Sequence, residues 1–483
     1  MPPPPTNTFS NGNLEGQYAF SMTGTDGSSG TLVPYARVGS FIADGKGGIS
    51  GGNEDVNIPG VLTNELSFLP GTYTVNGDGR GTMTLNDTTG SLTFSITLTS
   101  SSAGYLVDMP TDFSSAGNGS FVKQNPNSFS LSGFSGNYAF DLSGLDPGSF
   151  TESIVGQLIS NSAGALSGVA DDNDANTGVL ANTAISGSYA ADGLHVSDLS
   201  TFGRGLFAIG GVTGVFYIVG PNQVKLMETT SGGTLAGDAF SQSNIPTTAA
   251  GISGGFVYVM GGAGSGVPIT RGGRFTTSSG ALSSILVDNN NAGKAISLSA
   301  SSGTYTIDPS GNGRGTITYT VSGQSNAFIY VFYLISPTQA YVQDQSLNIV
   351  EDGSMLAQGT GAISNSSLAG NYAINWSGIT STGTGEGEED LVGATTLTTG
   401  ALTGTIDLNE FASGKQGIAI PLTGTLALSG DGTGHNAMTV NLASNPANNG
   451  ITSFAYVAAN NTILTMSTQT VRVVAGVLTP QAP

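Results

Sequence analysis

The chain repeats one pattern four times, and this repetition constrains its fold more than any other feature. An opening block of an apolar residue, Gly and an aromatic residue begins at Leu14 (LEGQYAF) and recurs from Phe134, Ile252 and Leu368, at intervals of 120, 118 and 116 residues. A closing block keeps Gly and Gln five residues apart and ends at Gln124, Gln242, Gln358 and Gln481. A period of this length is typical of tandem structural units in which each unit contacts its neighbours.

We therefore predict four units, at 14–124, 134–242, 252–358 and 368–481, preceded by an N-terminal extended tether or strand at 1–13. The Pro run within that first segment favours an extended chain. The three connectors, 125–133, 243–251 and 359–367, are nine residues each. A passive linker has no reason to keep its length, so equal connectors predict a regular relation between neighbouring units.

Within a unit, apolar and polar residues alternate, as in half-buried β-strands. Eight hairpin-linked strands with no helical pattern predict an all-β unit, and we favour an up-and-down β-barrel over a β-sandwich because closure removes exposed edges. Residues 327–335 (AFIYVFYLI) are apolar on both faces, so we expect a neighbouring unit to cover their outer side. The candidate strands of the first unit are 18–23, 37–43, 49–57, 72–76, 82–86, 92–99, 105–109 and 120–124.

Composition excludes several functions. Twelve Lys and Arg against 32 Asp and Glu give a net charge of −20, which argues against nucleic-acid binding and against a polybasic membrane contact. No apolar run is long enough to span a bilayer. The absence of Cys and the presence of only two His, His195 and His435, exclude disulfides, Cys-ligated metals and a three-His site. We interpret both His as unpaired turn residues, and many of the 74 Gly as hairpin-turn residues with positive φ.

A recurring signature pairs an Arg between two Gly with an Asp-x-Asn/Asp motif. We expect the Asp to cap its turn and to pair with the Arg of an adjacent strand, fixing register within one unit. A polar ligand site at one mouth of each barrel and a Ca²⁺ site are the alternatives, because Asp and Asn oxygens suit Ca²⁺. The fourth copy, with Gly432-Thr433-Gly434, lacks the Arg, and its Asp looks shifted by one position. The signature residues are Arg80, Arg204, Arg314, Asp55, Asn57, Asp172, Asp174, Asp288, Asn290, Asp407 and Asn409.

The one dense acidic run, Glu386, Glu388, Glu389 and Asp390, lies among Gly residues after Trp376. We interpret it as a solvated or cation-binding loop, since a flexible loop holds paired carboxylates poorly. The alternative is a carboxylate pair for glycoside hydrolysis. We expect Trp376 and the in-register aromatics to lie in the cores; the latter are Tyr18, Tyr138, Phe256 and Tyr372.

The segments GQYAF, ISGGNEDVN (49–57), GTYTVNGDGRGT (71–82) and GSFVKQ resemble the tandem Gly-rich repeats of large surface proteins and lipoproteins of acidobacteria. The likeness covers nearly the whole chain and is clearest in the first and third copies. It implies export and tandem β-units, and it brings no established activity and no catalytic residues.

These observations predict an extracellular or outer-surface protein, without enzymatic activity and without a cofactor except a conceivable Ca²⁺, whose role is structural or adhesive. The chain shows no export signal, which we interpret as a mature protein whose signal was removed. Apolar residues five positions before three opening blocks, Phe9, Phe129 and Ile363, could dock on the preceding unit. Phe9 would then dock on another molecule and build filaments, so the partner is the chain itself or a surface glycan. A glycan- or small-molecule-binding protein using barrel mouths, and a carboxylate-based glycoside hydrolase, remain the alternatives.

Overall fold

The computed structural model describes residues 8–59, 61–324, 326–361, 363–382, 385–411, 414–429, 433–443 and 450–483. The Pro run at 2–5, Gly432 and the side chain of Glu386 lie outside the described residues.

Four closed antiparallel β-barrels form the molecule, each with eight strand positions in up-and-down order, which confirms the all-β barrel prediction. The candidate strands of the first unit each overlap an observed strand. In this unit the fourth strand position is divided into β4 and β5, which both pair with β3. Its strands are β1 (Glu15–Asp26), β2 (Val33–Asp44), β3 (Gly48–Ile58), β4 (Val61–Ser67), β5 (Leu69–Val75), β6 (Arg80–Asn86), β7 (Ser91–Ser100), β8 (Ala103–Asp108) and β9 (Ser115–Lys123).

The second and third units keep the fourth strand whole, and the second inserts a short helix, α1 (Ser197–Phe202), before its fifth strand. The second unit comprises β10 (Ser135–Leu145), β11 (Thr151–Asn161), β12 (Ala165–Asp174), β13 (Gly178–Ala190), β14 (Arg204–Ile209), β15 (Val212–Gly220), β16 (Gln223–Glu228) and β17 (Ala236–Ser241). The third comprises β18 (Gly254–Gly264), β19 (Val267–Ser278), β20 (Ala281–Asn291), β21 (Lys294–Ile307), β22 (Arg314–Tyr319), β23 (Phe328–Ser336), β24 (Gln339–Asp344) and β25 (Ile349–Ala357).

Short 3-10 turns precede the first three units at η1 (Asn11–Asn13), η2 (Pro126–Ser128), η3 (Leu131–Gly133) and η4 (Ala249–Gly251). The fourth unit has the same strand order as the others. Its strands are β26 (Gly370–Thr382), β27 (Gly385–Thr398), β28 (Ala401–Glu410), β29 (Lys415–Leu428), β30 (His435–Leu442), β31 (Gly450–Val457), β32 (Ile463–Ser467) and β33 (Arg472–Pro480).

Side chains occupy most of each barrel interior, and the second barrel keeps a cavity of about 100 Å³ beside Phe140, Ile154 and Asp172. Each barrel encloses its own cluster of buried apolar residues, and the repeated aromatics Tyr18, Tyr138, Phe256 and Tyr372 all lie in these clusters, as does Trp376. Three interiors also contain a buried ion pair, formed by Arg37–Glu54, Arg271–Glu351 and Arg472–Glu389. A filled interior leaves little room for a ligand at the barrel mouths, in contrast to lipocalin-like barrels.

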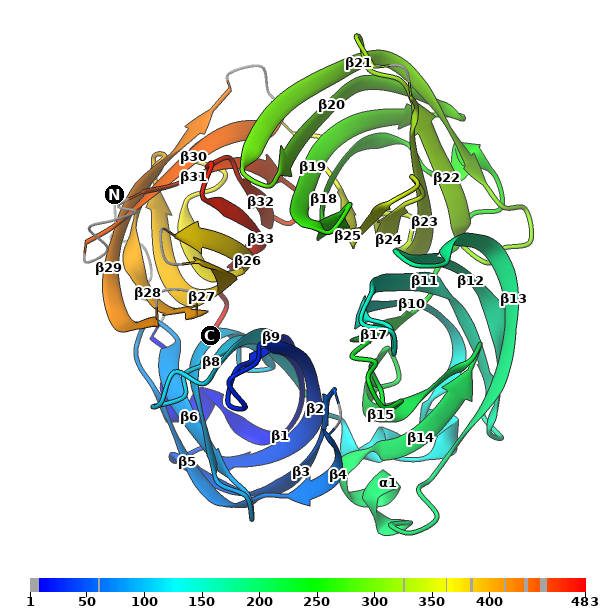
Figure 1. Cartoon of the computed structure of the whole chain (residues 1–483). Helices are drawn as coiled ribbons and strands as arrows, with labels where there is room; N and C mark the ends of the chain where they lie inside the picture. Colours follow the sequence, from blue (N-terminus) through cyan, green and yellow to red (C-terminus); the bar gives the residue numbers. More distant parts are fainter. Residues whose placement is uncertain are drawn as a thin grey trace.

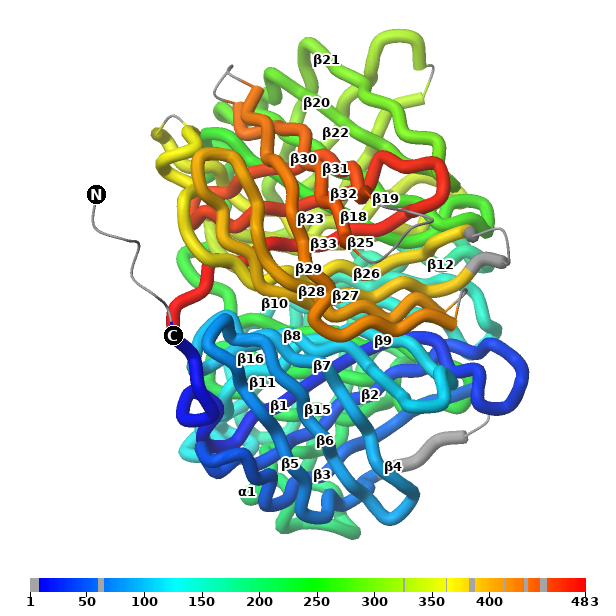
Figure 2. The backbone as a smooth tube through the Cα atoms, turned by 90° about the vertical axis from the view of Figure 1, so that its left-hand side faces the viewer, coloured from blue at the N-terminus to red at the C-terminus, as the bar shows by residue number. Residues whose placement is uncertain are grey.

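The four barrels form a closed ring in which the fourth unit contacts the first (Figure 1). Apolar residues of adjacent units form a seam at each of the four junctions. On β23, Val331, Tyr333 and Ile335 pack against Ala139 and Val155 of the second unit, which confirms that a neighbour covers this strand. At the end of the chain, Ala482 bridges to Ser100, so the C-terminal segment lies against the first unit (Figure 2).

Candidate functional site

The repeated Arg and Asp residues join neighbouring units rather than strands of one unit, so the intra-unit interpretation is wrong. Arg204 donates from Nε and Nη2 to both carboxylate oxygens of Asp55 in the preceding unit, at 2.9 and 2.8 Å. Arg314 does the same to Asp171, at 2.7 Å for each bond. Arg80 of the first unit reaches Asp407 of the fourth, at 3.2 Å. The pairs of Arg204 and Arg314 are bidentate, whereas Arg80 reaches Asp407 through Nη1 alone, and all three pairs clamp the ring at equivalent places.

The fourth copy makes the same pairing between neighbouring units, with His435 in the place of the Arg. His435 Nε2 lies 2.9 Å from Asp288 Oδ2 of the third unit, so it is not an unpaired turn residue. Tyr456 also donates to Asp288, as Tyr217 donates to Asp55 and Tyr333 to Asp171. Asp407 occupies the regular Asp position, so the expected one-residue shift in this copy is wrong.

In the second copy the signature is Asp171 and Asn173, not Asp172 and Asp174. Asp171 binds Arg314, whereas Asp172 lines the interior of its own barrel and Asp174 accepts from the backbone N–H of Asn176 in a turn. Two adjacent Asp residues made the alignment ambiguous in sequence. Alternation decides it, because only every second residue of β12 faces the neighbouring unit.

The Asn of each signature is also an interface residue. Each donates from Nδ2 to backbone carbonyls of the neighbouring unit's last hairpin, as Asn57 does to Glu228 at 3.0 Å and Asn173 to Asp344 at 2.7 Å. Asn290 and Asn409 donate in the same way to the carbonyls of Ser467 and Asp108. These residues therefore satisfy backbone acceptors at a buried junction.

The closing Gln residues complete the ring. Gln124 donates to the carbonyl oxygens of Phe202 and Ile218 in the second unit, at 2.8 and 2.7 Å. Gln481 makes the equivalent bonds to Asp78 and Leu98 of the first unit, at 3.0 and 2.8 Å. The fourth junction thus uses the same device as the first.

The expected docking of Phe9 on another unit is wrong. Phe9 is buried in the apolar cluster of its own first unit, and Phe129 is buried in that of the second unit. Ile363 packs against the cluster of the fourth unit, which follows it in sequence. Each residue closes the end of the barrel it precedes, and Gln481 of the same chain approaches Gly79 beside Phe9.

The acidic run lies on a strand, so the loop interpretation is also wrong. Glu388, Glu389 and Asp390 belong to β27, opposite Ile379, Gly378 and Ser377 of β26. Glu389 faces the barrel interior, where Arg472 donates to both its oxygens at 2.6 and 2.7 Å. Alternation places Glu388 and Asp390 on the outer face, toward the centre of the ring.

A cavity of about 430 Å³ lies where all four units meet. Four equivalent Gly residues on the first strands line it: Gly24, Gly144, Gly262 and Gly378. A Cβ at any of these positions would lie 2.0–2.5 Å from a backbone carbonyl oxygen of the adjacent segment, so this close approach requires Gly. We call this space the axial cavity.

Three acidic residues border the axial cavity: Glu152, Asp352 and Glu388. Glu152 lies opposite Gly144 as Glu389 lies opposite Gly378, so its side chain turns toward the interior of the second barrel, beside Asp172. None of the described residues lining it is Lys or Arg. Burial, and then repulsion from Asp172 and Asp174, raises the pKa of Glu152 to about 8. Burial likewise raises the pKa values of Asp352 and Glu388. Because these groups lack a cationic partner, a bound cation would favour their ionised forms.

Two further carboxylates stand behind this lining. Asp141 of the second unit contacts Asp352 of the third, and burial together with that neighbour raises the pKa of Asp141 well above its usual range. Asp390 is fully buried beside Glu388, and burial followed by repulsion from Glu388 raises its pKa strongly. The centre of the ring therefore concentrates acidic groups whose burial favours the protonated form.

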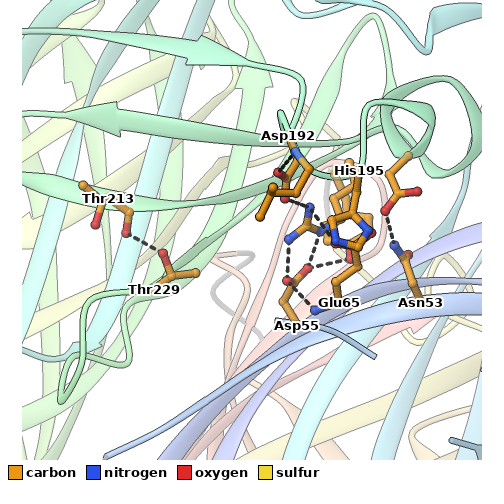
Figure 3. Close-up of polar contacts among 11 residues, drawn as sticks. Asn53, Asp55, Glu65, Asp192, His195, Thr213 and Thr229 are labelled. Atoms are coloured by element: carbon orange, nitrogen blue, oxygen red, sulfur yellow. Dashed lines mark hydrogen bonds and ion pairs between the residues drawn. The ribbon is translucent and has the colours of Figure 1, made fainter. Parts of the chain in front are cut away.

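A second cluster breaks the ring's regularity at the first junction (Figure 3). His195 Nδ1 lies 2.8 Å from Glu65 Oε1, so His195 too is paired, contrary to expectation. Arg204, bound to Asp55, also lies 2.8 Å from Asp192. Ligand atoms of Glu65, His195 and Asp198 all lie within 4.8 Å of one another.

Sequence reasoning missed Glu65, Asp141, Glu152 and Asp352. Glu65, Asp141 and Asp352 have no acidic counterpart in the other copies, and only Glu389 matches Glu152, so the repeat gave little signal for them. A usable signal was available in the second copy, where 191–203 replaces a turn that spans only 76–79 in the first.

No family model and no curated protein matches the chain. Among solved structures, transferrin-binding protein B from serogroup B Neisseria meningitidis is 9% identical, covering 78% of this chain and 83% of that one, with a TM-score of 0.22. A variant of transferrin-binding protein B from Haemophilus parasuis is 10% identical, covering 78% and 81%, with a TM-score of 0.21. These scores carry no functional argument. Within the described residues, no helix is long and apolar enough to cross a membrane.

Proposed function

We propose that this chain is a non-enzymatic extracellular binding protein, in which the ring is a rigid frame and the axial cavity holds a small organic cation. One observation carries the proposal: Asp352 and Glu388, from two different units, face one cavity that Glu152 of a third unit borders, and the described lining of this cavity contains no Lys or Arg. An ammonium group binds carboxylates of this kind through charge-assisted hydrogen bonds.

The size of the cavity supports a small-molecule ligand. A space of about 430 Å³ lies within the range of ligand pockets, and Tyr35, Leu145 and Ile379 give its wall apolar surface beside the carboxylates. A flexible polyamine suits a cavity with both carboxylates and apolar walls, since it has spaced ammonium groups joined by methylene chains. The cavity inside the second barrel is only about 100 Å³, so the larger axial cavity is the better place for such a ligand.

The closure of the ring supports a self-contained particle. Arg80 and the Gln481 side chain join the first and fourth units of one chain, and a filament would need these surfaces for a second molecule. The resemblance to exported repeat proteins supports a surface location.

Calorimetric titration with spermidine tests the proposal. We expect saturable binding at low salt that weakens at 0.5 M NaCl, because salt screens charge pairs. The combined variant E152Q/D352N/E388Q should bind at least about tenfold more weakly, the equivalent of 1.4 kcal/mol. Asp112→Asn, which removes one exposed carboxylate outside the cavity, is the matched control and should bind as the wild type does.

Proton release provides an independent readout. Since the cavity carboxyls have raised pKa values, an arriving cation lowers them and expels protons near pH 7. The observed heat should therefore change between buffers of different ionisation enthalpy. Equal binding by the wild type and the triple variant, or binding of a neutral oligosaccharide alone, would refute the proposal.

A further inference from the structure

The first junction of the ring differs from the other three in the residues around its Arg–Asp pair. Residues 191–203 of the second unit form an insertion that carries α1, Asp192, His195 and Asp198, whereas the third unit has only 308–313 at this place. The insertion lies against β3 and β4 of the first unit, where it meets Asn53 and Glu65 (Figure 3).

Glu65 occupies an unusual backbone position. Its N–H donates to Asp55, as Asn182 donates to Asp171 and Ala419 to Asp407, so the three residues are equivalent. All three have left-handed backbones, with φ of 61°, 52° and 57°. Asn tolerates this conformation and Glu does not favour it, so the side chain of Glu65 needs a separate explanation.

The cluster carries more negative charge than its one Arg can balance. Three carboxylates, those of Asp55, Glu65 and Asp192, surround Arg204, and a fourth, that of Asp198, contacts Glu65. Glu65 Oε2 is 3.7 Å from Arg204 Nη1, which leaves its Oε1 facing His195. With all four carboxylates ionised, a divalent cation at Oε1 would offset two of the three excess negative charges of the cluster.

Asn53 adds an independent sign of a missing partner. Its side chain is 1% exposed, its Nδ2 lies 3.5 Å from Asp198 Oδ2, and its Oδ1 has no hydrogen-bond partner. A buried amide with an unsatisfied oxygen is uncommon, and here it adjoins one of the candidate ligands. The side-chain Nδ2 of Asn53 also donates to the Asp198 carboxylate. Residues behind a metal ligand commonly make such a hydrogen bond and orient the ligand.

We propose that Glu65, His195 and Asp198 bind one divalent transition-metal ion, of which Zn²⁺ suits the site best. One imidazole nitrogen and two carboxylate oxygens within 4.8 Å of one another match a three-ligand zinc set with a position left for water. The imidazole favours Zn²⁺ over Ca²⁺ or Mg²⁺, which prefer oxygen ligands alone. Glu65 comes from the first unit and the other two from the second, so the ion links the two units.

Zinc titration of chelator-treated full-length protein tests the site. We expect one Zn²⁺ per chain, at least tenfold weaker binding for Glu65→Gln and for His195→Ala, and no change for Asp112→Asn. His195 is half exposed, so its removal should not prevent folding. Zn²⁺ should also raise the unfolding temperature of the wild type and not that of His195→Ala.

The result is separable from that for the axial cavity. The variant E152Q/D352N/E388Q leaves the three ligands intact and should bind Zn²⁺ as the wild type does. Loss of Zn²⁺ binding in that variant with retention in His195→Ala would place the ion in the axial cavity and overturn the inference. The absence of tight Zn²⁺ binding by the wild type would overturn it as well.

Discussion

Two regions of the ring, the junctions between units and the axial cavity, are built from the same strands. They differ in how many of their polar residues recur in all four copies. At the junctions, an Asp, an Asn and a closing Gln recur in all four copies. In the axial cavity the Gly positions recur, whereas Asp352 and Glu388 each belong to one copy. Strand register aligns Asp352 with Asn118, Ala236 and Ala475 in the other units.

This difference separates the frame from the candidate sites. Contacts that hold identical neighbours together must recur, because every junction solves the same packing problem. A ligand on the ring's axis is contacted once by each unit, so its recognition does not require identical residues. The cluster of Glu65, His195 and Asp198 is likewise not repeated, and it lies at the one junction that differs from the other three.

The largest expected effect comes from breaking a repeated pair. Arg204→Ala leaves the fully buried Asp55 without its cation, and loss of one partner of a buried ion pair costs about 3–5 kcal/mol. Chemical denaturation should show this loss in the free energy of unfolding. The double variant with Asp55→Asn should recover part of it, and a loss below 1 kcal/mol in Arg204→Ala would contradict the clamp.

A smaller effect is expected at the closing junction. Gln481→Ala removes the donor to two backbone carbonyls, those of Asp78 and Leu98, and leaving such acceptors unpaired costs about 1–3 kcal/mol. Hydrogen exchange should then increase in the first and fourth units before the others. Gln124→Ala is the matched variant, and its exchange should increase at the first junction instead.

A third effect concerns Glu152 at the edge of the axial cavity and depends on pH. The folded-state pKa of Glu152 is raised from 4.5 to about 8, so its contribution to stability is fully present below pH 4.5 and is lost as pH rises toward 8. Glu152→Gln should remove this part of the decline in melting temperature between pH 4.5 and 8. An unchanged pH slope would show that Glu152 ionises freely in the folded ring.

Several predictions from the sequence were wrong because the hydrogen-bond and ion-pair partners lie far apart in the chain. The Arg and Asp signatures were recognised as a pair, but Arg204 and Asp55 are 149 residues apart and belong to different units. His435 had no recognisable partner because its Asp288 lies in the preceding unit. Glu388 and Asp390 resembled a loop because Gly residues surround them, whereas ladder pairing with β26 keeps that segment extended.

The sequence by itself determined the four units, their barrel strands and the residues that recur at the junctions. These properties are local or periodic: alternation with period two sets which face of a strand is buried, and repetition marks equivalent positions. Only the tertiary structure decided that the units close into a ring, that the recurring polar residues pair across junctions, and that acidic residues of three units border one cavity. Those outcomes depend on how the barrels pack against one another, and chain periodicity does not encode that geometry.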